Sequence, residues 1–104
     1  LLQVALDYGG RAEIVHAVRA IIREGIPAEQ VTEAVVAAHL WTAGAPNPDL
    51  IIRTSGEMRT SGFLTYQSVY SEWVFTPTLW PDFSEHELDR ILHDYAKRHR
   101  RHGR

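Results

Sequence analysis

The apolar positions along the chain predict short buried strands separated by amphipathic helices. Residues 1–6 form an almost unbroken apolar run, which is typical of a buried strand. Between residues 14 and 22, apolar side chains recur three and four positions apart, which predicts a helix with one apolar stripe. Gly25 is placed to end this helix, and Pro27 suits the first position of a second helix with apolar residues between 31 and 40. The stripe of the first helix consists of Ile14, Val15, Val18, Ile21 and Ile22.

The second half of the chain repeats this alternation. Residues 50–53 and 72–75 each predict a short strand, and residues 63–70 predict a short helix between them. Ser84 and Glu87 stand at the spacing of a capping box, and the apolar residues that follow recur at helical spacing. Strands that alternate with helices favour an α/β fold, in which a parallel sheet is flanked by helices.

Length and composition limit the classes of protein to which the chain can belong. Its 104 residues suffice for one domain at most. Cysteine is absent, which excludes a disulfide scaffold and a thiolate metal site. No apolar run approaches the roughly 20 residues of a transmembrane helix, and no basic segment precedes Leu1 as in a signal peptide. Because an apolar strand opens the chain without a cap or turn, we expect residues 1–104 to be the C-terminal portion of one larger domain.

Charge is unevenly distributed along the chain, whose formal net charge is −2. Residues 1–96 hold all 13 acidic residues and 6 of the 11 lysines and arginines, whereas residues 97–104 hold the other 5 and no acid. A basic tail attracts phosphate, nucleic acid or an acidic partner, but the same pattern also suits a solvated helix end beside the helix dipole. The acidic body disfavours a broad nucleic-acid surface.

The candidate chemistry lies in residues 53–61, Arg-Thr-Ser-Gly-Glu-Met-Arg-Thr-Ser, which begin at the end of a predicted strand. Open α/β sheets bind ligands at the carboxyl ends of their strands. The planar guanidinium group offers a fork of donors that suits phosphate oxygens, and hydroxyl groups and backbone amides add further donors. Arg53, Arg59 and Ser61 are therefore candidates for a phosphate or diphosphate site.

Carboxylates near this segment allow other interpretations. One of the two arginines can pair with Glu57 or Asp49, since surface ion pairs of this kind are common. Glu72 opens the next predicted strand and suits Mg²⁺ as an oxygen ligand beside a diphosphate, but the residue taken alone favours a surface carboxylate or a partner for Arg53. The six histidines contain no second ligand pair at zinc spacing, so no histidine metal site is predicted.

Four motifs, in the same order as in the family, resemble those of the cis-prenyltransferases, typified by undecaprenyl diphosphate synthase and also called isoprenyl transferases. They are Tyr-Gly-Gly-Arg at 8–11, Asn-Pro-Asp-Leu-Ile-Ile-Arg-Thr-Ser-Gly-Glu at 47–57, Trp-Pro-Asp-Phe at 80–83 and Arg-Arg-His-Gly at 100–103. The resemblance implies an α/β enzyme with a parallel sheet, a dimeric state, and an apolar tunnel for the growing chain. It implies a reaction in which an allylic prenyl diphosphate condenses with isopentenyl diphosphate in the presence of Mg²⁺.

The resemblance also implies roles for particular residues. Arg53, Arg59 and Ser61 match the residues that bind the diphosphate of isopentenyl diphosphate, and Thr60 between them adds its amide. Glu72 matches the glutamate that helps to hold Mg²⁺. We further expect a cytoplasmic protein that makes peripheral membrane contact through its lipid product and binds no nucleic acid.

The C-terminal tail matches the family, whereas the family's N-terminal half and two single positions do not. Arg101 and Gly103 match the Arg-x-Gly motif that reaches a neighbouring active site across the dimer. The N-terminal half, with the catalytic aspartate, does not match any segment of this chain, so we expect the 104 residues alone to be inactive. Asp7 and Gly62 stand where the family usually has asparagine.

Two alternatives to a catalytic prenyltransferase remain. One is a non-catalytic partner subunit of a heteromeric cis-prenyltransferase, which shares the fold and supplies the Arg-x-Gly tail. Such subunits tend to lose the residues that bind diphosphate, so the joint presence of Arg53, Arg59, Ser61 and Glu72 argues against this alternative. The other is a phosphate- or nucleic-acid-binding module that uses the basic tail, which the acidic body disfavours. Neither product length nor the allylic starter is encoded in a recognisable motif.

Overall fold

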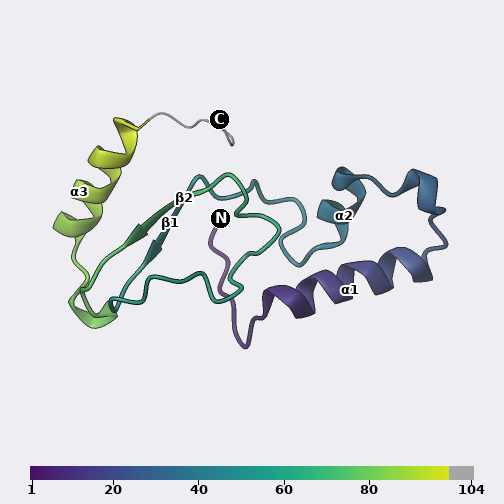
Figure 1. Cartoon of the computed structure of the whole chain (residues 1–104), viewed down its shortest axis with the longest axis horizontal. Coiled ribbons are helices and arrows are strands. Elements are labelled where there is room, and N and C mark those ends of the chain that lie inside the picture. Colours follow the sequence, from purple (N-terminus) through teal and green to yellow (C-terminus); the bar gives the residue numbers. More distant parts are fainter. Residues whose placement is uncertain (99–104) are drawn as a thin grey trace. The chain divides into compact units, whose positions relative to one another are not determined.

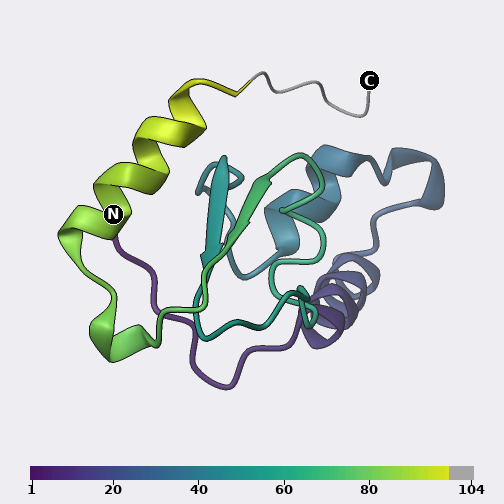
Figure 2. The same ribbon diagram turned by 60° about the vertical axis from the view of Figure 1, so that its left-hand side comes forward.

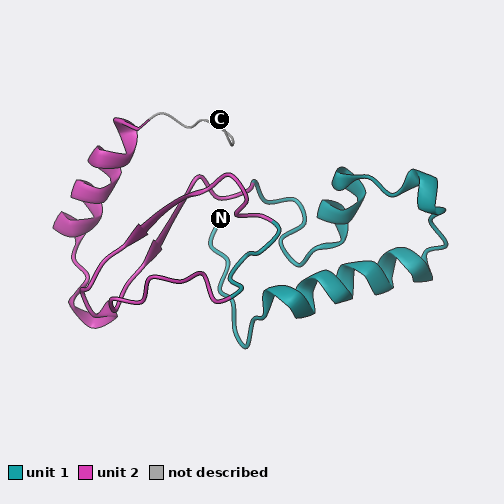
Figure 3. Ribbon diagram, viewed as in Figure 1, with its two compact units in different colours: residues 1–46, 62–66 teal, residues 47–61, 67–104 magenta. Residues whose placement is uncertain are grey.

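The computed structural model describes residues 1–98, and the chain forms two compact units (Figures 1 and 3). Unit 1 comprises residues 1–46 and 62–66, and unit 2 comprises residues 47–61 and those from 67 onward. Helices α1 and α2 belong to unit 1, while both strands and helix α3 belong to unit 2. The predicted tail residues Arg101 and Gly103 lie outside the described part of the chain.

Helix α1, Gly10–Arg23, confirms the predicted first helix and ends where the sequence indicates. Gly25 has a φ of +71°, a left-handed conformation that glycine adopts without steric cost. The amide of Gly25 donates to the carbonyl of Ile22 at 3.0 Å, and that of Ile26 donates to Ile21 at 3.3 Å. These two bonds form a Schellman motif, which satisfies carbonyls that the helix end would otherwise leave unpaired.

The buried face of α1 differs from the predicted apolar stripe. Glu13, Ala17 and Ile21, spaced four residues apart, are buried. Val18 and Ile22 are exposed, with 46% and 70% of their surfaces accessible. Helix α1 contacts α2, and its buried residues include a carboxylate, Glu13, that the apolar stripe did not predict.

Helix α2, Glu33–His39, begins later than Pro27 predicts. Pro27 instead precedes a 3₁₀ turn, η1, at Ala28–Gln30. Thr32 is the N-cap of α2, because its hydroxyl oxygen accepts a hydrogen bond from the Val35 amide at 3.2 Å. The prediction that the second helix starts at Pro27 was therefore wrong.

Residues 1–6 form no strand, which contradicts the predicted buried strand. Leu1, Leu2, Val4 and Leu6 are all exposed, the least exposed being Val4 at 72%. Residues 1–98 contain one sheet of two strands, and neither strand pairs with this segment. An extended apolar run without a hydrogen-bonding neighbour has no partners for its amides and carbonyls, so it stays outside a sheet.

The two strands of unit 2 confirm the predicted strands and their parallel pairing. Strand β1 is Leu50–Arg53 and strand β2 is Glu72–Phe75 (Figure 2). Leu50 lies opposite Glu72, and Arg53 lies opposite Phe75. The ladder continues one step past β1, where the Thr76 amide donates to the Arg53 carbonyl at 2.9 Å. This register sets the positions of the candidate site residues along the sheet.

The connection between the strands contains turns rather than the helix predicted at 63–70. Ser61, Gly62 and Leu64 have φ values of +49°, +73° and +49°. A right-handed helix requires negative φ at every residue, so these left-handed residues prevent a helix from starting there.

Helix α3, Glu85–Ala96, follows the short 3₁₀ turn η2 at Trp80–Asp82. Its predicted N-cap is confirmed, because the Ser84 hydroxyl oxygen accepts a bond from the Glu87 amide at 3.1 Å. The predicted capping box is only half formed, since the Glu87 carboxylate accepts bonds from threonine hydroxyls after β2 rather than from the Ser84 amide. Among residues 1–98, no helix has the length and apolar character that crossing a membrane requires.

Candidate functional site

The carboxyl end of β1 brings Arg53 and Ser61 together, as the sequence predicts. Nη1 of Arg53 donates to the carbonyl oxygen of Arg59 and, at 3.0 Å, to the hydroxyl oxygen of Ser61. One guanidinium group thereby closes the loop between these residues. The loop, residues 54–61, is named the diphosphate loop below, after the ligand that the sequence predicts for it.

A turn at Ser55 and Gly56 opens the diphosphate loop. Both residues have left-handed φ values, +69° for Ser55 and +76° for Gly56. The Ser55 amide donates to the Thr78 carbonyl at 2.8 Å, and the Gly56 amide donates to the Thr76 carbonyl at 3.0 Å. The segment after β2 therefore fixes the turn in place. A left-handed serine is unusual, and such a conformation persists only where neighbouring contacts hold it.

Arg59 pairs with Glu57 within the diphosphate loop. Its Nη2 lies 3.0 Å from Oε2 of Glu57, and the two side chains are 71% and 49% exposed. This pair is one of the alternatives that the sequence left open. An ion pair this exposed contributes little free energy, so a diphosphate can displace the glutamate at small cost. Thr60 is exposed beside it.

Glu72 does not lie at the same end of the sheet as Arg53. The register places Glu72 beside Leu50, three residues back along β1, which corresponds to about 10 Å at the usual rise of a strand. Its Oε2 lies 3.4 Å from Nη1 of Arg98, so a cation already faces this carboxylate. Within residues 1–98, no three histidine, cysteine or acidic side chains gather as a metal site would require.

Glu72 therefore offers a single carboxylate, which by itself is not a complete metal site. Mg²⁺ is often held by one or two carboxylates together with substrate phosphates and water. The donor chemistry of Glu72 fits that pattern, provided that the remaining ligands come from the substrate or from protein groups beyond this cluster. The role of Arg101 and Gly103 at a neighbouring site stays a prediction, because both lie outside the described residues.

A polar cluster in unit 1 was not predicted from the sequence. The buried Glu13 carboxylate accepts bonds from the Tyr8 hydroxyl at 2.5 Å and from the Trp41 amide at 2.9 Å. Burial, followed by the hydrogen bond to Glu13 and the charge of Glu13, raises the pKa of Tyr8 to about 12. The only signal in the sequence was the spacing of Glu13, Ala17 and Ile21, which places a carboxylate on a buried helical face.

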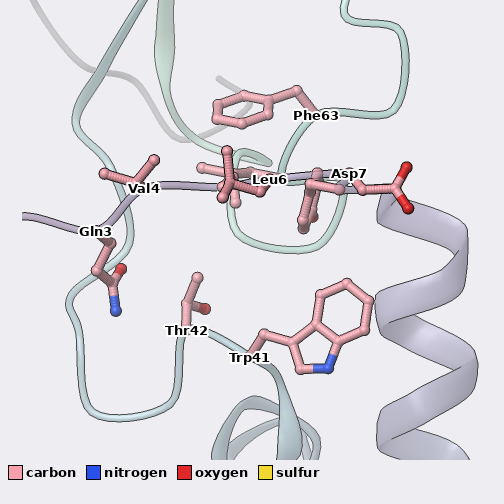
Figure 4. A pocket seen from close by; sticks show the side chains of 10 residues that line it. Gln3, Val4, Leu6, Asp7, Trp41, Thr42 and Phe63 are labelled. Carbon is pink, nitrogen blue, oxygen red and sulfur yellow. The ribbon is translucent and has the colours of Figure 1, made fainter.

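A pocket of about 560 Å³ adjoins this cluster in unit 1. Figure 4 shows Phe63 on one side of the segment from Gln3 to Asp7, and Trp41 on the other. The ring of Tyr8 packs edge-on against both aromatics, with centroids 5.8 Å from Trp41 and 5.6 Å from Phe63. The pocket lining is mainly apolar and aromatic, which suits a hydrocarbon group better than a charged one.

Close backbone contact explains the second glycine of the Tyr-Gly-Gly-Arg motif. A Cβ atom at Gly10 would lie 2.1 Å from the Gly62 carbonyl oxygen and 2.3 Å from the Thr65 hydroxyl oxygen. No other residue fits there without moving the segment that follows Ser61. The two departures from the family pattern are also accommodated, since Asp7 at φ +50° and Gly62 at φ +73° belong to the residue types that adopt left-handed backbone most readily.

Comparison with known families identifies the chain. A family model described as "Putative undecaprenyl diphosphate synthase" matches residues 1–103. The chain therefore belongs to the undecaprenyl diphosphate synthase family of prenyltransferases, as the motifs indicated.

Curated relatives of similar sequence are prenyl diphosphate synthases from several bacteria. An isoprenyl transferase of Streptococcus agalactiae is 50% identical over 111 residues, covering 99% of this chain and 44% of the relative. A short-chain Z-isoprenyl diphosphate synthase of Mycobacterium leprae is 52% identical, with 99% and 42% covered. A (2Z,6E)-farnesyl diphosphate synthase of Mycolicibacterium smegmatis is 50% identical, with the same coverage. The chain thus spans less than half the length of the curated relatives it matches.

Solved structures confirm the α/β fold class. Lavandulyl diphosphate synthase from Lavandula x intermedia, in complex with dimethylallyl diphosphate, has a TM-score of 0.87 and 42% identity, covering 96% of this chain and 45% of that one. A "probable undecaprenyl diphosphate synthase" from Campylobacter jejuni has a TM-score of 0.83 and 30% identity, covering 96% and 46%.

Proposed function

We propose that the intact protein elongates prenyl chains with Z geometry, by condensing isopentenyl diphosphate with an allylic diphosphate to give a longer polyprenyl diphosphate. The observation that carries this proposal is the Arg53 guanidinium group at the end of β1, bonded to Arg59 and Ser61 across the diphosphate loop. Names of relatives support it, since two are Z-isoprenyl or (2Z,6E)-farnesyl diphosphate synthases and one solved neighbour holds dimethylallyl diphosphate.

The diphosphate loop binds isopentenyl diphosphate and orients it. Arg59 leaves Glu57 and donates to the diphosphate, while the Ser61 hydroxyl and the Thr60 amide add hydrogen bonds. Arg53 donates to the diphosphate as well and keeps the loop closed, so that the alkene of isopentenyl diphosphate faces the allylic carbon.

The reaction proceeds as the allylic carbon–oxygen bond breaks and the diphosphate leaves with the bonding electrons. The alkene then forms the new carbon–carbon bond, and loss of a proton leaves a product five carbons longer. Exclusion of water protects the cationic intermediate from hydrolysis.

Magnesium is the cofactor proposed for this reaction, with Glu72 as one of its oxygen ligands. The ion neutralises charge on the departing diphosphate when it is bound. Glu72 would hold the ion through the carboxylate oxygen that lies 3.4 Å from Nη1 of Arg98. The ligands that complete the shell belong to the substrate and to other segments of the intact protein.

The proposed assembly is a cytoplasmic homodimer that contacts the membrane through its lipid product. Arg101 and Gly103, which lie outside the described residues, are proposed to serve the active site of the neighbouring subunit, so that the basic tail has a specific anionic partner. The alternative, a non-catalytic partner subunit of a heteromeric cis-prenyltransferase, is disfavoured because the residues suited to diphosphate are present. Turnover by the purified protein without a second kind of chain distinguishes the two.

Replacing Arg53 tests the proposed function. In the intact protein, Arg53→Ala removes charge-assisted hydrogen bonds, which are each worth about 1.5–3 kcal/mol. We expect the KM for isopentenyl diphosphate to rise about tenfold or more, measured with radiolabelled isopentenyl diphosphate, an allylic starter and Mg²⁺. Arg53→Lys keeps the charge but loses the planar fork, so it recovers only part of the loss.

Arg19→Ala is the matched control, since it removes an exposed arginine of α1. An Arg53→Ala variant with the KM and kcat of the parent would refute the assignment, and a parent protein without turnover would refute the proposed function itself.

Replacing Glu72 tests the magnesium proposal. Mutation of a group that supports a metal site typically lowers metal affinity by about 10- to 100-fold. We therefore expect Glu72→Gln to raise the Mg²⁺ concentration for half-maximal rate by about tenfold. Glu85→Gln removes an exposed carboxylate from the start of α3 and serves as the control. A Mg²⁺ titration curve identical to that of the parent would exclude Glu72 as a ligand.

A further inference from the structure

Glu87, in the first turn of α3, also binds the segment that follows β2 in unit 2. Its Oε2 accepts hydrogen bonds from the Thr76 hydroxyl at 2.5 Å and from the Thr78 hydroxyl at 3.1 Å. The Glu87 side chain is only 12% exposed, and Thr76 is buried. One carboxylate therefore fixes two residues of the segment that follows β2.

The same two threonines hold the diphosphate loop through their backbones. The Thr78 carbonyl accepts from the Ser55 amide at 2.8 Å, and the Thr76 carbonyl accepts from the Gly56 amide at 3.0 Å. The Thr76 amide in turn donates to the Arg53 carbonyl at 2.9 Å. Thr76 and Thr78 thus bond to Glu87 through their side chains and to the diphosphate loop through their backbones.

The turn held in this way is strained. Ser55 has a φ of +69°, a left-handed conformation that is unfavourable for a residue other than glycine. The bond from the Ser55 amide to Thr78 and that from the neighbouring Gly56 amide to Thr76 offset this cost. Releasing the two threonines would let the turn relax and move the residues around it.

The Glu87 carboxylate is suited to hold both hydroxyls. The hydrogen bond from Thr76 lowers its pKa, and Thr78 and Arg90 lower it further against the opposing effect of desolvation. An ionised carboxylate accepts hydrogen bonds from both hydroxyl groups, and such charge-assisted bonds are stronger than neutral ones. Arg90, 3.8 Å away on the same helix, adds a weak exposed ion pair.

We propose that Glu87 is a positioning residue for isopentenyl diphosphate, acting through Thr76 and Thr78 on the turn that opens the diphosphate loop. Glu87 itself touches no substrate. The inference rests on the proposed function, because it assigns the loop between Arg53 and Ser61 to that diphosphate. It extends the site from the end of β1 to the first turn of α3.

Steady-state kinetics of two Glu87 variants of the intact protein test this inference. Glu87→Ala removes the acceptor, and misplacement by about 1 Å costs up to roughly 100-fold, so we expect the KM for isopentenyl diphosphate to rise about ten- to 100-fold. The KM for the allylic diphosphate stays within about twofold, since small changes of that size are expected away from an altered contact. Glu87→Gln keeps an oxygen acceptor for the hydroxyls and recovers most of the loss.

Glu85→Ala, the exposed neighbour in the same turn, is the matched control and keeps the kinetics of the parent. Equal losses for both substrates in Glu87→Ala, or parental values in that variant, would overturn the positioning role. If Glu87→Ala fails to fold, Glu87→Gln decides the matter, because a loss without recovery in a folded Gln variant contradicts the proposed geometry.

Hydrogen exchange gives a readout that does not depend on turnover. The Ser55 and Gly56 amides should exchange faster in Glu87→Ala, while the amides of β1 and β2 keep their protection. Unchanged exchange at Ser55 and Gly56 would overturn the inference. A parent without turnover would refute the proposed function, and the exchange rates would still show whether Glu87 orders the turn.

Discussion

His39, in unit 1, has a hydrogen-bond acceptor at each of its two ring nitrogens. Its Nδ1 lies 2.7 Å from the Val35 carbonyl oxygen, and its Nε2 is paired with the Glu24 carboxylate. Both partners are acceptors only, so both ring nitrogens must carry a proton for both bonds to form. The hydrogen bond to Val35 and that to Glu24 raise the pKa of His39 above 6.5, despite the opposing effect of desolvation.

This raised pKa predicts a pH-dependent contribution to folding. A histidine with a higher pKa in the folded state binds its proton more tightly there, so the stabilisation is complete below 6.5 and disappears as the pH rises through the folded pKa. We expect the difference in Tm between the intact parent and His39→Gln to be largest at about pH 6 and to shrink by about pH 8, where a typical histidine is neutral.

Thermal unfolding at both pH values measures this effect, and an NMR titration of the His39 ring measures the pKa directly. His86→Gln, on the exposed side of α3, is the control and should leave the pH dependence unchanged. A folded-state pKa for His39 at or below 6.5 would show that the two hydrogen bonds do not form together in solution.

Residue types predicted part of the candidate site. Arg53 and Ser61 were expected to converge at a strand end, and they do so because the ladder stops at Arg53 and the loop folds back. The Arg59–Glu57 pair was equally allowed by the sequence, since charges two residues apart are always within reach. The bonds of Glu13 to Trp41 and of Glu87 to Thr76 were missed because these partners lie on other segments, 28 and 11 residues distant.

At the scale of elements, local signals predicted those segments that stabilise themselves. The existence of α1, its glycine stop and the Ser84 cap of α3 were predicted correctly, whereas the buried face of α1 was not. The strands β1 and β2 were recognised from short apolar runs between turns. Their parallel pairing followed from the alternation of strands with helices, because a parallel pair needs a long crossover.

Elements that depend on distant contacts or on backbone conformation were predicted wrongly. The apolar run at 1–6 has the composition of a strand, but a strand requires a neighbour, and composition does not supply one. The segment at 63–70 has helical composition, yet left-handed residues at Ser61, Gly62 and Leu64 precede and interrupt it. Glu87 was expected to complete a capping box, but two buried hydroxyls compete for the same carboxylate.

At the scale of the whole molecule, little apolar surface is buried within the described residues. The buried apolar side chains are Ala17, Ile21 and Leu40 in unit 1 and Ile51 and Ile91 in unit 2. Large apolar residues, by contrast, are exposed along residues 1–6 and on α1. The sheet of unit 2 has two strands, and a pair of strands alone is marginally stable in water.

This burial predicts that the 104 residues expressed alone are weakly stable. We also expect them not to turn over substrate, because no segment of this chain matches the family's N-terminal half with its catalytic aspartate. A core this small leaves the entropy of chain ordering barely offset, so we expect a broad thermal transition near or below about 45 °C, the lower end for ordinary domains. Circular dichroism measures the transition, and binding of an apolar dye measures the exposed surface. The Campylobacter jejuni relative, of which this chain covers 46%, provides the reference for a cooperative transition. A sharp transition above about 65 °C, the upper end of that range, would contradict the predicted low stability. Prenyl transfer by the 104 residues alone would contradict the predicted inactivity.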